Sequence, residues 1–263
     1  MTKETKKLLT DIISDFKKAT ELPCYSVKLL KRPPNPDMFE NKIGGMPYLP
    51  VNEKYPCDKK GNPMALLLQI NCKDIDLPAF PKTGYFEIYM NASLDIDSEC
   101  IVKHFEDRQT CQFKFPAIDM SDFIIERPYA IKLQKTTCYM PASDYRFDKT
   151  FLEISTKHNC PIECIYEISK VFPNEENIET EFISLLSKAI KNPEITIGGY
   201  ADFTQDDPRF YDDEKDFCIL KIDSYYPGSL INIGDAGILN VYTHLNEFQS
   251  KNFASTELVW DCY

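Results

Sequence analysis

The feature that most restricts the fold of this chain is a set of three short segments that occurs twice in the same order. The first set lies at 43–45 (Ile-Gly-Gly), 66–71 (Leu-Leu-Leu-Gln-Ile-Asn) and 84–90 (Gly-Tyr-Phe-Glu-Ile-Tyr-Met). The second set lies at 197–199 (Ile-Gly-Gly), 218–223 (Cys-Ile-Leu-Lys-Ile-Asp) and 237–243 (Gly-Ile-Leu-Asn-Val-Tyr-Thr). Corresponding segments are 152 to 154 residues apart, so the two sets keep one register. An internal duplication is the simplest explanation of this pattern.

The third segment of each set predicts a β-strand with the same alternation of side chains. In the first strand, Phe86 and Ile88 lie on one face and Glu87 and Tyr89 lie on the other. In the second strand, the matching residues are Leu239, Val241, Asn240 and Tyr242. Because a shift of one residue would exchange the two faces, the shared alternation supports equivalent strands in the two halves of the chain.

Two amphipathic helices are predicted outside the repeated segments. In 2–20, apolar residues recur at helical spacing with charged residues opposite them, and Pro23 ends the pattern. The polar face of this helix mixes both signs of charge, which favours docking against the core over binding to a membrane surface. In 177–191, acidic residues precede the apolar stripe and lysines end it, an order that suits the helix dipole.

Most of the remaining ordered chain is predicted as strand. Short strands are expected around 25–29, 101–105, 129–133 and 258–263, and 162–168 is compatible with either strand or helix. We therefore expect an α+β fold, mainly antiparallel β-sheet, whose two β-rich halves pack about a pseudo-twofold axis. No linker separates the halves, which favours a single globular unit over 1–263. Its parts are 1–40 (N-terminal helix and strand), 41–172 (first β-rich half), 173–195 (connector helix) and 196–263 (second β-rich half).

The charge and composition narrow the compartment and the partners. The chain carries 41 acidic and 30 basic residues, a formal net charge of −11. This charge disfavours nucleic acid and anionic membranes as partners and is compatible with a basic protein partner. No apolar run is long enough to cross a bilayer and no secretory signal follows Met1, so we expect a cytoplasmic protein. Ten cysteines without close pairing favour reduced thiols in apolar surroundings.

The most polar candidate site is the loop that follows the second Gly-Gly pair. It contains Asp202, Gln205, Asp206, Asp207 and Arg209. The guanidinium group of Arg209 can bind a neighbouring carboxylate through two parallel hydrogen bonds, and the alternative is a loop whose charges are paired internally. Four more acids follow, at Asp212, Asp213, Glu214 and Asp216. Together they offer enough oxygen ligands for Ca²⁺ or Mg²⁺, but the spacing of an EF-hand is absent, so a solvated loop without a metal site is favoured.

Two other patterns favour structural roles. His158, Cys160 and Cys164 offer three soft ligands for zinc, but the C-x₂-C spacing and a fourth ligand are absent. The Gly-Gly pairs lack the further glycines and the Gly-Lys-Ser/Thr ending of phosphate-binding loops, so they predict tight turns with positive φ. No hydrolase motif occurs and no cofactor is indicated.

Residues near the C-terminal end complete the candidate binding set, namely Asp235, Trp260 and Asp261. Trp260 and the paired Tyr89 and Tyr242 can line a ligand cleft, because these rings combine an apolar face with a polar edge. Core packing is the favoured alternative for all three rings.

An ordered set of motifs runs from about residue 41 to the end of the chain. It consists of 42–50 (Lys-Ile-Gly-Gly-Met-Pro-Tyr-Leu-Pro), 67–71 (Leu-Leu-Gln-Ile-Asn), 197–199 (Ile-Gly-Gly), 203–209 (Phe-Thr-Gln-Asp-Asp-Pro-Arg), 234–237 (Gly-Asp-Ala-Gly) and 260–262 (Trp-Asp-Cys). This set resembles the YwqG-like family of bacterial proteins, which carry a domain of unknown function. The resemblance implies no established activity, substrate or cofactor, so no catalytic residues are carried over. The chain departs from the family pattern at Tyr200-Ala201, where a proline often follows the glycines, and at Lys221, where glutamine is usual.

These observations favour a non-enzymatic binding or protein-interaction module that uses the groove between the halves or the acidic loop 202–216. Two alternatives stay open. A metal-assisted hydrolase would use the acidic loop. An immunity-type protein would neutralise a basic partner, with net charge speeding the association. The first half has Pro-Tyr-Leu-Pro at 47–50 where the second has its acidic loop, so we expect function to lie in this asymmetry.

Overall fold

The computed structural model describes residues 1–36, 38–95, 97–107, 110–211, 215–224 and 230–263. Within these ranges, ten strands form one sheet in the order β10-β9-β8-β7-β1-β6-β2-β3-β4-β5, and neighbouring strands run antiparallel. The strands are β1 (Leu22–Leu29), β2 (Lys42–Ile43), β3 (Ala65–Asn71), β4 (Tyr85–Met90), β5 (Cys100–Phe105), β6 (Tyr129–Cys138), β7 (Ile195–Ile197), β8 (Phe217–Asp223), β9 (Ile238–Thr243) and β10 (Glu257–Asp261). The α-helices are α1 (Lys3–Ala19), α2 (Phe147–Lys157), α3 (Ile168–Val171), α4 (Ile178–Ala189) and α5 (Leu245–Gln249), and 3₁₀ turns lie at η1 (Cys72–Asp74), η2 (Ile165–Glu167) and η3 (Pro208–Tyr211). The chain thus has the α+β, mainly antiparallel fold that the sequence predicts.

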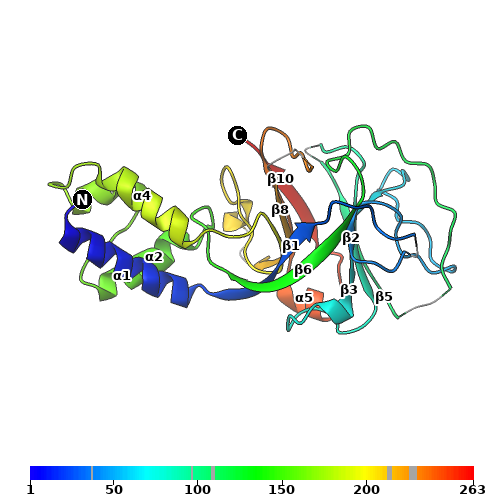
Figure 1. Ribbon diagram of the computed structural model, residues 1–263, viewed down its shortest axis with the longest axis horizontal. Helices are drawn as coiled ribbons and strands as arrows, with labels where there is room; N and C mark the ends of the chain where they lie inside the picture. The colour runs from blue at the N-terminus through cyan, green and yellow to red at the C-terminus, as the bar shows by residue number, and fades with distance from the viewer. Residues whose placement is uncertain (37, 96, 108–109, 212–214, 225–229) are drawn as a thin grey trace.

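The two edges of the sheet approach each other, so the sheet is nearly closed (Figure 1). Trp260 of β10 donates an indole hydrogen bond of 3.0 Å to the main-chain oxygen of Asp95, in the segment before β5. Cys100 of β5 places its Sγ 3.8 Å from the main-chain oxygen of Thr256, next to β10. The main core fills the inside of this curved sheet and draws on strands from both halves.

The side-chain alternation predicted for the two repeated strands is confirmed. Phe86, Ile88, Leu239 and Val241 belong to the main core. Tyr89 and Tyr242 are buried in separate, smaller clusters. Packing against apolar side chains is therefore the surrounding of these two tyrosine rings, as favoured from the sequence.

The strand order is compatible with a duplicated chain. β2, β3, β4 and β5 follow one another on one side of the central β1–β6 pair, and β7, β8, β9 and β10 follow one another on the other side. Both β3 and β8 carry a register shift, between Leu66 and Leu68 and between Cys218 and Leu220. The duplication itself, and the domain bounds set out above, stay predictions.

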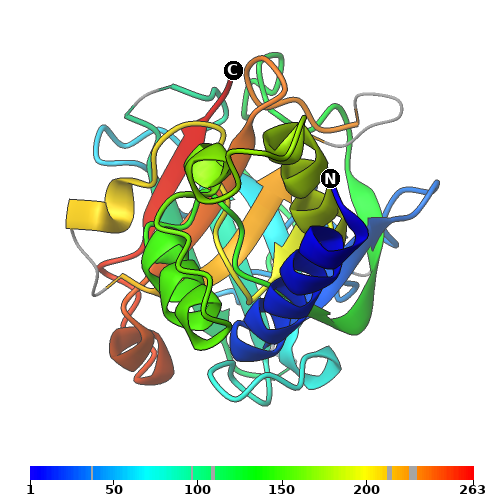
Figure 2. The ribbon, with the colours of Figure 1, turned by 90° about the vertical axis from the view of Figure 1, so that its left-hand side faces the viewer.

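Three helices form a cluster at one end of the long β1–β6 pair (Figure 2). α1 begins where the Thr2 side chain accepts a hydrogen bond from the Thr5 amide, and its apolar stripe is buried against α2 and α4. Phe16 of α1 lies 4.9 Å from Phe147 and 5.3 Å from Phe151 of α2, measured between ring centres. Both predicted helices are thus confirmed, and the N-terminal one docks against the protein.

Two details differ from the sequence predictions. Residues 165–168 of the segment 162–168 belong to the helical turns η2 and α3, so the helical alternative is correct for this part of the segment. The predicted first β-rich half, 41–172, also contains α2, whose Phe147, Phe151 and Ile154 share one helical face and are buried. A three-residue stripe is too short to outweigh neighbouring strands from sequence alone, and packing against α1 and α4 supplies the rest.

Both Gly-Gly pairs adopt positive φ, as predicted. Gly44 and Gly45 have φ of +70° and +85°, and Gly198 and Gly199 have φ of +73° and +89°. A Cβ atom on Gly199 would lie 2.3 Å from the Sγ of Cys138, so this position requires glycine for space as well as for conformation.

The ten cysteines are free, and six of them are buried, in agreement with the expected reduced thiols. In the part of the chain that the structure describes, no helix combines the length and apolarity that crossing a membrane requires.

Candidate functional site

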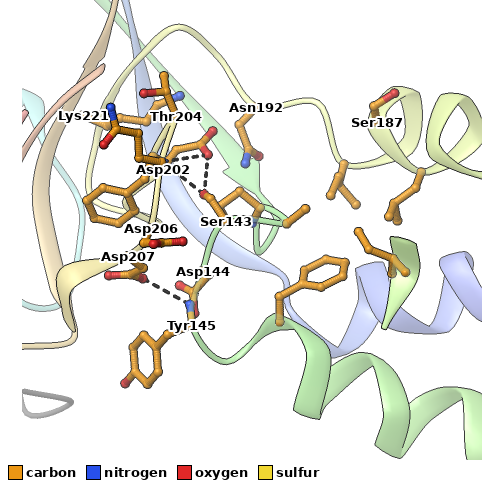
Figure 3. Close-up of a pocket in the computed structure, with 18 of the residues that line it drawn as sticks. Ser143, Asp144, Tyr145, Ser187, Asn192, Asp202, Thr204, Asp206, Asp207 and Lys221 are labelled. Carbon is orange, nitrogen blue, oxygen red and sulfur yellow. Dashed lines mark hydrogen bonds between the residues drawn. The ribbon is translucent and has the colours of Figure 1, made fainter. Parts of the chain in front are cut away.

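A cavity of about 1120 Å³ lies between the helical cluster and the second half of the sheet. Its helical side includes the apolar Phe147, Ile165, Ile183, Leu186 and Ile190, of which all but Ile183 are buried, and also the polar Asp148, Ser187 and Lys191. Its sheet side is polar and includes Asp202, Thr204, Asp206 and Lys221 (Figure 3). Asp223 lines the same side. A concave site with one apolar wall and a few polar groups on the other is typical of small-molecule sites.

Lys221 brings a positive charge into the polar wall. It lies in β8, paired in register with Thr196 of β7 and Asn240 of β9. Lys221 is only 3% exposed, and its Nζ makes no hydrogen bond or ion pair with another residue that the structure describes. The hydroxyl groups of Thr196 and Thr204 are also buried without a hydrogen-bond partner in the described chain. Since buried charges are usually paired, this wall is suited to bind an anionic group.

Carboxylates from three segments lie around Lys221. Burial raises the pKa of Asp223, Lys221 opposes this rise, and Asp202 and Glu194 add to it. All four residues line the same cavity. Asp202 is held in position because its Oδ1 accepts hydrogen bonds from Ser143 Oγ at 2.7 Å and from the Phe203 amide at 3.1 Å.

The loop that carries Asp202 is fixed to the sheet by Asn240. The Asp202 amide donates to Asn240 Oδ1 at 3.1 Å, and Asn240 Nδ2 donates to the Asp202 main-chain oxygen at 2.7 Å. Asn240 is fully buried, so this pair of hydrogen bonds replaces water for both partners. The polar wall is therefore built on a strand of the sheet and not on a free loop.

Three buried side chains, Asp144, Asp207 and Arg209, form a charged network beside the cavity with the half-buried Arg146. Arg209 donates from Nε and Nη2 to Asp207 at 3.0 and 2.6 Å, and from Nη2 to Asp144 at 3.1 Å. Arg146 donates from Nε and Nη2 to Asp144 at 2.8 and 2.7 Å. Burial alone would raise the pKa of Asp144, but Arg146 and Arg209 hold it below its usual value. Burial opposes the charge of Arg209, yet Asp207 and Asp144 raise its pKa further.

This network joins the segment before α2 to the loop 202–210. The Tyr145 amide adds a hydrogen bond of 3.1 Å to Asp207. The structure thus bears out the internally paired loop for Asp207 and Arg209, which the sequence analysis held as the alternative to a free carboxylate clamp. Their side chains hold the cavity walls together, and the neighbouring Asp206 is exposed and lines the cavity.

The other candidate residues divide into two groups. Gln205 and Asp261 hold the loop, since Asp261 Oδ2 accepts from the Thr204 and Gln205 amides, both at 2.7 Å. Asp235 and Trp260 lie outside this cavity: Asp235 is exposed, and Trp260 is half-buried at the closure of the sheet. A ligand-binding role for either residue is untested.

The sequence analysis did not select Ser143, Asp144, Lys221 and Asp223 for the site. Lys221 had a signal, because a lysine within the strand Cys-Ile-Leu-Lys-Ile-Asp interrupts an apolar segment and departs from the family pattern. Ser143 and Asp144 had none, since they come from a loop about 60 residues before their partners. Their contribution depends on how the helical cluster packs on the sheet.

The metal hypotheses gain no support from the described residues. Among them, no group of three or more His, Cys, Asp or Glu side chains is arranged to hold a metal ion. His158 lies instead 3.0 Å from Asp15, between its Nε2 and the Asp15 Oδ2. Asp212, Asp213 and Glu214 of the acidic loop lie outside the described residues.

A second cavity, of about 970 Å³, lies beside the first Gly-Gly pair. Its lining is mostly apolar and includes Pro33, Pro34, Met46, Phe113 and Ile125. Lys42 also lines it, but its Nζ donates to the main-chain oxygen of Met38 at 3.2 Å. The first cavity is the stronger candidate because its buried ammonium is not engaged by a described residue.

Comparison with known proteins gives one assignment. A family model described as Domain of unknown function (DUF1963) matches residues 41–262. The match includes every strand except β1 and both polar and apolar walls of the first cavity. A search of curated proteins found no match. Because the family model covers most of the chain, the protein belongs to the DUF1963 family.

Proposed function

We propose that this protein is a non-enzymatic binding protein whose cavity between the helical cluster and the sheet takes a small organic molecule with a polar head and an apolar body. The observation that carries this proposal is the opposition of two walls, with apolar side chains from α2 and α4 on one side and charged groups around Lys221 on the other. A volume of about 1120 Å³ is ample for a metabolite or a short peptide.

The paired charges beside the cavity support a preformed binding site. Arg209, Asp207 and Asp144 pair with one another and fix the walls of the cavity. A site whose side chains are held before binding loses less conformational entropy when a ligand enters. The arrangement is therefore suited to recognise one class of ligand.

A cavity-blocking variant tests the proposal. Ser187 is exposed on α4 and lines the cavity, so Ser187→Trp should fill it from the helical side. Lys188→Trp is the matched control, because Lys188 is the next residue of the same helix and does not line the cavity. Both variants and the wild type are screened by thermal unfolding against mixtures of amino acids, amines, carboxylic acids and sugars.

We expect at least one mixture to stabilise the wild type and the Lys188→Trp variant but not Ser187→Trp. A ligand at 100 times its Kd stabilises a protein by about 2.7 kcal/mol, which raises Tm by about 5–10 °C for a chain of this size. The proposal fails if no mixture shifts the wild type, or if Ser187→Trp responds as the wild type does.

Three finer assignments belong to this proposal. The motifs at 42–50, 203–209 and 260–262 support placing the chain among the YwqG-like proteins within its family. Ten free cysteines are consistent with a cytoplasmic location, where thiols stay reduced. A basic protein partner stays a prediction from the net charge of −11.

A further inference from the structure

The charge of Lys221 restricts the head group that the cavity can accept. Lys221 is 3% exposed, so its ammonium group has already lost most of its contact with bulk water. An acceptor that reaches its Nζ therefore gains a charge-assisted hydrogen bond with little further loss of lysine hydration. The ligand should carry an anionic or strongly accepting group.

The surrounding acids exclude a ligand that is only anionic. Asp202, Asp206, Asp223 and Glu194 line the cavity, and the side chains of Asp223 and Glu194 make no ion pair with a described residue. A phosphate or a dicarboxylate on Lys221 would face this set of like charges, which disfavours its binding. A ligand that is only cationic would match the acids and leave Lys221 without a partner. A group that joins an ammonium and a carboxylate satisfies both.

The opposite wall restricts the body of the ligand. Ile183, which is half-buried, and Tyr166, which is exposed, line the cavity on the helical side, and the buried side chains of Phe147, Ile165, Leu186 and Ile190 lie behind them. Burial of apolar surface contributes about 25 cal/mol per Å², so an apolar side chain that covers Ile183 and the Tyr166 ring adds to affinity. A small polar amino acid would leave both in contact with water.

We propose that the cavity binds a free α-amino acid with a large apolar side chain, with Lys221 holding the carboxylate, Asp202 and Asp223 holding the ammonium, and the helical wall covering the side chain. This inference rests on the proposed function and names its ligand class. Such an amino acid carries its ammonium and its carboxylate on one carbon atom. This arrangement matches charges of both signs gathered on a single wall. The helical wall then selects the side chain by size and apolarity.

Four probes separate the contributions that the carboxylate, the ammonium and the ring make to binding. L-phenylalanine carries both charges and the ring, phenethylamine lacks the carboxylate, 3-phenylpropanoate lacks the ammonium, and glycine lacks the ring. Binding to the full chain is measured by isothermal titration calorimetry at pH 7. We expect L-phenylalanine to bind at least tenfold more tightly than each of the other three.

Lys221 variants test the carboxylate contact. Lys221→Met removes the charge and keeps a side chain of similar length, and Lys221→Gln is a second variant in case methionine disturbs the fold. Lys188→Met is the control, because Lys188 is exposed on α4 and does not line the cavity. We expect Lys221→Met to lose at least tenfold in affinity for L-phenylalanine and to bind phenethylamine no more weakly than the wild type does, while Lys188→Met changes neither by more than about threefold.

Asp223→Asn tests the contact with the ammonium group. It should weaken the binding of L-phenylalanine without weakening the binding of 3-phenylpropanoate. The inference is overturned if phenethylamine or 3-phenylpropanoate binds as tightly as L-phenylalanine, although the proposed function then stands with another ligand class. It is also overturned if none of the four probes binds, or if Ser187→Trp binds L-phenylalanine as the wild type does. If none of the four probes binds, the mixture screen with Ser187→Trp decides separately whether the cavity binds any small molecule.

Discussion

Asp207 should be essential for the stability of the cavity walls, although it does not itself need to touch a ligand. Its carboxylate accepts hydrogen bonds from the Arg209 amide at 3.0 Å, from Arg209 Nε at 3.0 Å and Nη2 at 2.6 Å, and from the Tyr145 amide at 3.1 Å. In Asp207→Ala, Arg209 stays 2% exposed with Asp144 as its remaining carboxylate partner, and its Nη1 already has no described partner. Removal of one member of a buried ion pair costs about 3–5 kcal/mol.

Because Asp144 still offers one hydrogen bond to Arg209, we expect the lower end of that range, about 3 kcal/mol. Urea unfolding followed by circular dichroism measures it, and thermal unfolding should show a Tm about 6–12 °C lower than that of the wild type. Asp206→Ala is the matched control, since Asp206 is the preceding residue, is exposed, and should change stability by less than about 0.5 kcal/mol. A loss below about 1 kcal/mol in Asp207→Ala, or equal losses in both variants, would refute the reasoning that the network joins the two walls.

Two further predictions concern the backbone and a buried acid. Gly199→Ala should destabilise the protein by at least about 2 kcal/mol, because it combines left-handed backbone strain with a Cβ 2.3 Å from Cys138 Sγ. Gly61→Ala is the control, since Gly61 has a similar φ of +87° and no atom within 4 Å of a Cβ, and it should lose only about 1 kcal/mol. Equal losses in urea unfolding would contradict the steric argument. Burial raises the pKa of Glu87 to about 8, so the folded state retains its proton above the ordinary value of 4.5, and stability should fall as pH rises from about 4.5 to about 8. Glu87→Gln should remove up to about 4 kcal/mol of this fall between pH 5 and pH 8.5, and a pH dependence identical to that of the wild type would show that Glu87 does not cause it.

The sequence predicted the parts of the fold that follow from local pattern. The alternation in 84–90 and 237–243 indicates strands with one core face, and the stripes in 2–20 and 177–191 indicate helices, because each pattern extends over enough residues to outweigh its neighbours. The glycine turns at 44–45 and 198–199 were predictable for the same local reason. The near-closure of the sheet was not, since it depends on contacts such as Trp260 to Asp95 that join distant parts of the chain.

The candidate site was predictable only in part. The polar loop at 202–209 was found because its residues are adjacent in sequence, and the structure places Asp202 and Asp206 at the cavity. The different roles of Asp206 and Asp207 could not be predicted from the sequence, because they depend on which of the two side chains points toward the network of Arg209 and Asp144. The helical wall was missed because a cavity between two layers has no signature in either layer alone.

The position of Lys221 follows from a comparison of two rows of polar residues in the sheet. In the first half, neighbouring strands place Lys42, Gln69 and Glu87 side by side. In the second half, the corresponding places are held by Thr196, Lys221 and Asn240. In the first row, the amide of Tyr48 donates to Gln69 Oε1 at 2.7 Å and to Glu87 Oε1 at 2.9 Å.

The second row holds its loop with one acceptor fewer. The Asp202 amide, which corresponds to that of Tyr48, donates to Asn240 alone among the described residues, because an ammonium group has no lone pair to accept a hydrogen bond. Lys221 thus gives up the loop-holding role of Gln69 and presents its charge to the cavity. If this exchange created the binding site, Lys221→Gln should act in opposite directions on two measurements. The free energy of unfolding without ligand should rise by about 1 kcal/mol, through a new hydrogen bond and the loss of an unpaired buried charge, whereas affinity for L-phenylalanine should fall at least tenfold. A variant that lost both stability and affinity would show instead that Lys221 supports the fold.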